Sequence, residues 1–206
     1  MDLPFDPIAR AAAIWERRFG DSRAMAAVTS IMRVQQILLA ELDARLRPHG
    51  LTFARYEALV LLTFSRQGAL PLRLIGQRLM VHPTSVTNTI SRLERQELVV
   101  RRPNPLDGRG ILAEITPAGR DVVVRATADL TAADFGMGGY SEDQLEEMFG
   151  MLRGLRVMAG DFQDEGEGGT ARPDQPAEMR DACHVLPPSA VMNTSPRPDS
   201  AGTATP

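Results

Sequence analysis

Several residue types are rare or absent in this sequence. Among its 206 residues there is no lysine, one cysteine and three histidines, so all 23 basic residues are arginine. Cys183 has no second cysteine to form a disulfide or a CxxC metal pair, and nothing therefore indicates an oxidising compartment. No two histidines have the spacing of metal ligands, so we expect no metal site and no cofactor. The histidines are His49, His82 and His184.

Long apolar runs are also missing. The longest, around Ala58–Leu62, is far too short to cross a bilayer. The N-terminal stretch MDLPFDP is acidic and lacks the charged and apolar parts of a signal peptide. The sequence contains no convergent set of nucleophile, base or metal ligands, which an enzyme would need. We therefore expect a cytoplasmic protein that neither contacts a membrane nor acts as an enzyme.

The formal net charge of −3 hides an uneven distribution along the chain. Residues 47–125 contain twelve arginines and six acidic residues, a local charge of +6. Residues 126–160 contain two arginines and six acidic residues (−4), and residues 161–206 contain three and eight (−5). The basic middle segment favours a polyanionic partner, although an ordinary solvated surface can have the same composition.

Apolar spacing and capping residues predict a mainly α-helical protein. Asp6 and Gly20 bracket a first short helix, Thr52 is placed to cap another, and Ser141 begins the last. Two β-branched segments around a Pro/Asp/Gly loop predict a two-stranded hairpin. The predicted helices span residues 7–19, 22–46, 53 to near 68, 72–79, 83–96, 117–135 and 141 to beyond 155, and the strands span 98–102 and 110–115.

The same pattern predicts three segments. Residues 1–21 form an N-terminal extension with the short extra helix, and residues 22–162 form the main unit, with a central lobe at about 52–118. Residues 163–206 are rich in Pro, Gly, Ser, Thr and acidic residues and lack apolar periodicity. Such a segment does not bury enough apolar surface to offset the entropy lost on ordering, so we expect a disordered tail.

The predicted helix over residues 83–96 has two contrasting faces. Val86, Ile90 and Leu93 form an apolar stripe that we expect to pack on the short helix before it. Short polar side chains crowd the first turns of the other face, and arginines follow. Capping accounts for one such hydroxyl group but not for several in neighbouring positions. The polar residues are Thr84, Ser85, Thr87 and Asn88, and the arginines are Arg92 and Arg95.

These residue types suit a helix that enters the major groove of double-stranded DNA. Short side chains let the helix approach base edges, asparagine pairs with adenine, and the arginines reach phosphates. Arg55, on the helix that begins at residue 53, is a further predicted DNA contact. Arg109 lies at the tip of the hairpin, where it is placed to enter the adjacent minor groove. Asp107 either pairs with an arginine or simply forms the turn.

The run from LTFARYEALVLL to DGRGILAEITPAGR resembles the winged helix–turn–helix of the MarR family. The resemblance covers roughly residues 22–160, and its most specific part is the wing, in which Asp107, Arg109, Thr116 and Gly119 are in family register. It implies a mainly α fold with N- and C-terminal dimerisation helices and a two-stranded β wing. It also implies a homodimeric repressor that a small aromatic or anionic effector releases from a pseudo-palindromic operator.

The extra N-terminal helix resembles a branch of the family that binds urate or similar purines. That resemblance makes Trp15 and Glu57 ligand contacts, with Glu57 where the branch usually has aspartate. Thr89 stands where the branch tends to have arginine, so we expect an effector other than urate. Packing of an amphipathic helix would equally explain Trp15. The alternative function is a helical protein-interaction module without ligand response or specific DNA binding.

Overall fold

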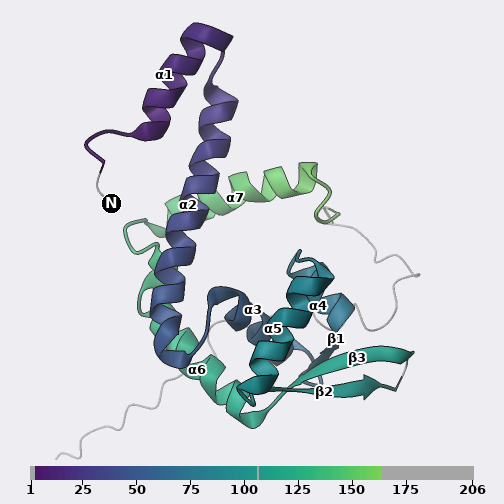
Figure 1. The fold of residues 1–206 in the computed structure, drawn as a ribbon. Coiled ribbons are helices and arrows are strands. Elements are labelled where there is room, and N and C mark those ends of the chain that lie inside the picture. Colours follow the sequence, from purple (N-terminus) through teal and green to yellow (C-terminus); the bar gives the residue numbers. More distant parts are fainter. Residues whose placement is uncertain (1–2, 106, 164–206) are drawn as a thin grey trace, which may run out of the picture. The chain divides into compact units, whose positions relative to one another are not determined.

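The computed structural model describes residues 3–105 and 107–163, without the side chains of residues 107–109. The described part is mainly α-helical with a small sheet, as the sequence predicts (Figure 1). From residue 164 on, the predicted tail lies outside the described residues, and Cys183 is part of it. The elements in chain order are α1 (Pro7–Phe19), α2 (Arg23–Leu46), η1 (Arg47–His49), α3 (Phe53–Phe64), β1 (Ala69–Pro71), α4 (Leu72–Arg78), α5 (Pro83–Arg95), β2 (Val99–Asn104), β3 (Asp107–Ile115), α6 (Pro117–Thr131), η2 (Asp134–Gly136) and α7 (Glu142–Met158).

Two helices end earlier than the sequence predicts. Helix α3 ends at Phe64 rather than near Gly68, because the chain becomes extended at Ser65 and soon enters β1. Helix α6 ends at Thr131 rather than near residue 135. The residues of η2 follow with φ angles of 46°, 51° and 79°, and such left-handed backbone does not continue a right-handed helix.

The sheet has three antiparallel strands, in the order β1-β3-β2, where the sequence predicted two. Strand β1 pairs with β3 through Leu70↔Ala113 and its two neighbours. The prediction missed β1 because three residues ending in proline are too short to show alternation. Since β1 runs directly into α4, it connects the helix–turn–helix to the hairpin made by β2 and β3.

A buried core lies beneath α5 and joins it to α3, α4, α6 and the sheet. The predicted stripe of Val86, Ile90 and Leu93 is confirmed, since all three side chains are buried. Ile75 of α4 is buried beside them, and the rest of the predicted contact surface of α4 is partly buried against the same core. Burial of apolar surface therefore determines which face of α5 points inward.

Polar caps start several helices, though one of them differs from the prediction. Asp6 caps α1, and Ser141 forms a capping box at the start of α7, both as predicted. Thr52 takes the predicted N-cap position of α3, but its side chain accepts no hydrogen bond from a backbone N–H there; its Oγ1 accepts one from Nε of Arg55 at 3.2 Å. Instead, Oδ1 of Asp43 in α2 accepts a hydrogen bond from the backbone N–H of Phe53 at 2.7 Å.

The Thr-Pro-x-Gly sequence fixes the start of α6 against the end of α5. Oγ1 of Thr116 accepts a hydrogen bond from the backbone N–H of Gly119 at 3.0 Å and donates one to the carbonyl oxygen of Glu97 at 2.8 Å. Gly119 lies so close to Leu98 that a Cβ atom would stand 2.3 Å from the Leu98 carbonyl oxygen. A glycine is therefore required at this position by the close approach of two backbone segments.

We predict that Gly119→Ala lowers the free energy of unfolding by about 2 kcal/mol, because the added methyl group must displace backbone rather than a flexible side chain. Urea unfolding followed by circular dichroism measures the change. Gly139→Ala is the matched control, since a Cβ there has no atom within 4 Å, and its stability should stay close to native. Equal stability of the two variants would contradict this account of Gly119.

Candidate nucleic-acid interface

A tight turn connects α4 to α5 and sets the angle between them. Met80 has a φ of 53°, and the backbone N–H of Val81 donates to the carbonyl oxygen of Gly76 at 3.0 Å, which ends α4. His82 then starts α5, because its Nδ1 accepts a hydrogen bond from the backbone N–H of Thr84 at 3.3 Å. The sequence feature interpreted as a helix–turn–helix is therefore present in the fold.

Helix α5 presents three faces, which follow from its rotation of about 100° per residue. The first is the buried stripe that packs into the core. The second is an outer face exposed to solvent, with short polar side chains near its N-terminus and arginines further along. The third turns toward β2. The outer face consists of Thr84, Ser85, Asn88, Arg92 and Arg95, and the third face consists of Thr87, Ser91 and Glu94.

Thr87 differs from the other predicted contact residues of α5. Its hydroxyl group donates a hydrogen bond to the carbonyl oxygen of Pro83 at 3.0 Å, within the helix. Its own carbonyl oxygen accepts a hydrogen bond from Arg101 of β2 at 3.2 Å. Although the Thr87 side chain is exposed, its hydroxyl proton is used by α5 itself, which leaves the hydroxyl oxygen as an acceptor.

Arg55 holds the end of α5 against the junction of α2 and α3. Its Nη1 donates hydrogen bonds to the carbonyl oxygen of Gly50 at 2.9 Å and to Oε1 of Gln96 at 3.3 Å. Burial lowers the pKa of the Arg55 guanidinium, and the positive charge of Arg92 lowers it further, against an opposite effect of Asp43. The sequence did not indicate these contacts. Arg55 and Arg92 together concentrate positive charge beside α5.

Arg109 and Asp107 belong to β3, next to the turn of the hairpin. Their side chains lie outside the described part of the structure, so their predicted roles stay predictions. The backbone register is irregular here, shifting between Pro103 and Asn104 where β2 approaches its end. The hairpin itself is present beside α5, as the sequence predicts.

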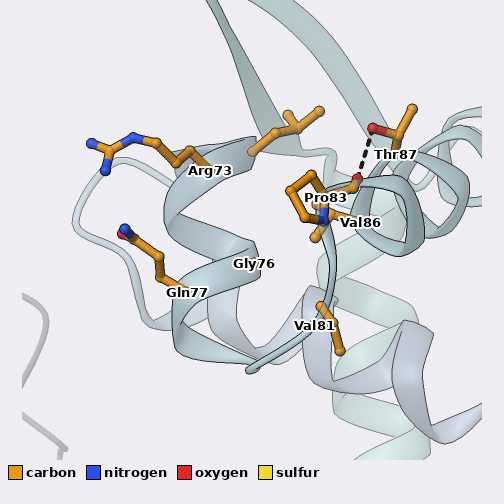
Figure 2. A pocket seen from close by; sticks show the side chains of 8 residues that line it. Arg73, Gly76, Gln77, Val81, Pro83, Val86 and Thr87 are labelled. Carbon is orange, nitrogen blue, oxygen red and sulfur yellow. Dashed lines mark hydrogen bonds between the residues drawn. The ribbon is translucent and has the colours of Figure 1, made fainter. Parts of the chain in front are cut away.

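A pocket of about 510 Å³ lies between α4 and α5 (Figure 2). Its walls are mostly apolar, and Arg73 and Gln77 extend from α4 at its rim, opposite Thr87 of α5. The volume is within the range of small-molecule sites. Sequence reasoning missed this pocket because α4 and α5 enclose it only when they are folded together. Its apolar lining consists of Leu72, Gly76, Val81, Pro83 and Val86.

The predicted ligand contacts Glu57 and Trp15 lie in different elements, α3 and α1. Glu57 is half-buried at a small pocket of about 80 Å³, which Ser85 and Thr89 of α5 also line. Burial raises the pKa of the Glu57 carboxyl group. Trp15 lies in α1, and its ring packs against Phe19 with 5.0 Å between the centroids. Their shared role in ligand binding stays a prediction.

Within residues 3–105 and 107–163, no group of three or more His, Cys, Asp or Glu side chains is arranged to hold a metal ion. None of the helices in that part of the chain combines the length and apolar character needed to cross a bilayer.

We predict that Glu57→Gln raises the melting temperature at pH 7.5. The folded-state pKa of Glu57 lies above its ordinary 4.5, so folding penalises the charged carboxylate. That penalty is absent below pH 4.5 and fully present above the folded-state pKa, so the difference in melting temperature should shrink toward zero at pH 4. Glu16→Gln, at an exposed position of α1, is the control and should give no such rise. A difference that stays constant with pH would contradict the prediction.

Comparison with known proteins identifies the family. Residues 49–110 match the model of the MarR family. Sco5413, a MarR family transcriptional regulator from Streptomyces coelicolor, is 64% identical, with 68% of this chain and 97% of that chain covered and a TM-score of 0.65. The HTH-type transcriptional repressor Rv2887 of Mycobacterium tuberculosis is 31% identical over 104 residues, which are 50% of this chain and 73% of that protein. CouR from Rhodococcus jostii RHA1, in a structure bound to p-coumaroyl-CoA, is 26% identical, with 63% and 89% covered and a TM-score of 0.54. The chain belongs to the MarR family of transcriptional regulators and is not an enzyme.

Proposed function

We propose that this regulator is a homodimeric repressor that binds a pseudo-palindromic operator in double-stranded DNA and leaves it when a small aromatic or anionic ligand binds. The observation that carries the proposal is the division of α5 into a buried apolar stripe and an exposed face of short polar side chains and arginines. The relative Rv2887 is a transcriptional repressor, which supports repression rather than activation.

The outer face of α5 has the chemistry that a major groove requires. A groove about 12 Å wide admits one helix, and the short side chains of Thr84 and Ser85 keep the backbone close to the bases. Asn88, one turn further, has the amide geometry that pairs with adenine, and Arg92 and Arg95 suit phosphates. The positive N-terminal end of the α5 dipole adds attraction for the DNA backbone.

The hairpin supplies the second proposed contact. Arg109 stands next to its turn and would enter the minor groove beside the site of α5. The excess of arginine over acidic residues in 47–125, a local +6, supports a polyanionic partner for this whole lobe. A DNA partner supports the cytoplasmic location that the sequence analysis expected.

The helices at the two ends of the chain require a partner for their apolar side chains. Within the described residues, no side chain of α1 or α7 is buried. Phe149, Met151 and Met158 of α7 are 61%, 66% and 81% exposed, and α2 exposes Met32 and Ile37 by 57% and 59%. Apolar exposure on this scale marks an interaction surface, and a second copy of the chain satisfies it symmetrically. This supports residues 22–162 as the dimerising and DNA-binding unit, with 1–21 as an extension and 163–206 as a tail.

The α4–α5 pocket supports the ligand response. A molecule that fills it contacts both helices of the helix–turn–helix, so it changes their spacing where α5 must fit the groove. Its apolar walls suit an aromatic group, and the Arg73 guanidinium at the rim suits an anionic one. CouR, bound to p-coumaroyl-CoA, is a relative that holds a ligand with both features. The release is limited by the difference in ligand affinity between the free and DNA-bound arrangements.

Fluorescence anisotropy tests the DNA-binding proposal. Full-length protein is titrated against the intergenic DNA beside its own gene and against a random duplex, each at several salt concentrations. Tight binding that falls steeply with salt and favours the intergenic duplex is expected, since counterions are released from the phosphates. Weak and equal binding to both duplexes would contradict a sequence-specific role.

We predict that Asn88→Ala reduces the preference for the operator over a random duplex by about ten-fold, while affinity for the random duplex stays near native. The reason is that the loss of a base contact lowers affinity only for duplexes that carry that base. Thr131→Ala, outside the lobe at the end of α6, is the control. Equal losses on both duplexes would instead place Asn88 on a phosphate.

We predict that Phe149→Glu on α7 converts the dimer to a monomer at micromolar concentration, because it places a charge within an apolar interface. Sedimentation velocity measures the mass, and circular dichroism verifies the helix content. Phe64→Glu is the matched control, since Phe64 is 66% exposed but belongs to α3 in the DNA-binding lobe. A Phe149→Glu protein that remains dimeric would show that α7 does not form the interface.

A further inference from the structure

Arg101 of β2 contacts the third face of α5, away from the residues proposed to touch DNA. Its Nη1 donates a hydrogen bond to Oε2 of Glu94 at 2.9 Å. Its Nη2 donates to Oγ of Ser91 at 2.7 Å and to the carbonyl oxygen of Thr87 at 3.2 Å. One guanidinium group thus spans about two turns along the side of the helix.

This guanidinium group is committed to the protein rather than to a phosphate. The Arg101 side chain is only 27% exposed, and both protons of its Nη2 are used by α5. Its Nε is buried without a hydrogen-bond partner among the described residues. The neighbouring Arg102 is 62% exposed and pairs instead with Glu114 of β3.

The Arg101 contact lies where it can restrain the orientation of the hairpin relative to α5. The chain passes from α5 to β2 through a short turn, in which Glu97 has a φ of 60°. A short turn alone permits the helix and the hairpin to pivot relative to each other. Arg101 makes its contacts beyond this turn, where β2 lies beside α5 (Figure 1), so it adds a directional polar attachment to the core that the helix and the sheet share, and this attachment resists the pivot.

We infer that Arg101 is a positioning residue for DNA recognition: through Glu94, Ser91 and Thr87 it fixes the angle between α5 and the β2–β3 hairpin. The inference rests on the DNA-binding function proposed above. With the angle fixed, the outer face of α5 and Arg109 meet adjacent grooves of one stretch of duplex. Without it, the two contacts no longer fit a single site together, and sequence discrimination falls.

Glu94 makes a charge-neutral test possible. An unpaired Glu94 carboxylate on α5 would repel DNA, so Arg101→Met alone would mix lost geometry with added repulsion. The double variant Arg101→Met/Glu94→Gln removes one positive and one negative charge and leaves the net charge unchanged. The matched control is Arg102→Met/Glu114→Gln, which makes the same exchange in the neighbouring pair without touching α5.

The experiment measures anisotropy of the full-length proteins with the duplex that the native protein binds most tightly and with a random duplex, over a salt series. The Arg101/Glu94 variant is expected to lose about ten-fold in affinity for the preferred duplex, with random-duplex affinity and salt slope unchanged. The control variant should discriminate as the native protein does. Circular dichroism at the assay temperature establishes that each protein is folded.

Four results would overturn the inference. Native discrimination by the Arg101/Glu94 variant would remove Arg101 from recognition. A parallel loss on both duplexes, with a salt slope lower by about 0.9, would make Arg101 a direct phosphate contact. Arg101→Lys is a milder variant that keeps the charge but cannot bridge the three acceptors, and full discrimination by it would equally contradict the inference. A native protein that does not discriminate between duplexes would instead remove the proposed function, and the inference with it.

Discussion

Burial of one stripe of α5 is the constraint on which the rest of the structure depends. Val86, Ile90 and Leu93 are all but inaccessible to water, and rotating the helix about its axis would expose them at a cost of several kcal/mol. With that stripe fixed inward, helical geometry determines the two remaining faces. One carries the short polar residues and arginines outward, and the other turns toward β2. The chemistry of the interface is thus a consequence of the packing of the core.

Around this helix, polar contacts supply the orientation that apolar burial leaves undetermined. Arg55 attaches the end of α5 to the junction of α2 and α3, and Thr116 attaches the start of α6 to Glu97, just after α5. His49, next to that junction, contacts Asp129 of α6 with 2.7 Å between Nε2 and Oδ2. The end of α5 is therefore connected both to the hairpin and to the helices proposed to dimerise. An effector between α4 and α5 would act on a helix that is already held at its C-terminal end and on the side facing β2.

The sequence was sufficient for features that depend on local spacing, and insufficient for those that depend on tertiary approach. The stripe at Val86, Ile90 and Leu93, and the caps at Asp6 and Ser141, follow from periodicity and side-chain type. Asp43 replaces the predicted Thr52 cap because α2 folds back onto α3, which no local pattern records. The short strand β1 exists only because β3 lies beside it. Arg101 and Glu94 have opposite charges, but their pairing requires the turn between α5 and β2.

Selection of bound duplexes from a random DNA pool, followed by sequencing, is the measurement that tests the central claim most directly. It uses the full-length native protein and requires no knowledge of the operator. The account predicts an enriched inverted repeat with half-sites centred about one helical turn, roughly 10 base pairs, apart, because two copies of α5 enter successive major grooves. A pool that shows no enriched sequence after repeated rounds would contradict the claim that the outer face of α5 reads DNA. An enriched single site without a repeat would contradict the dimer.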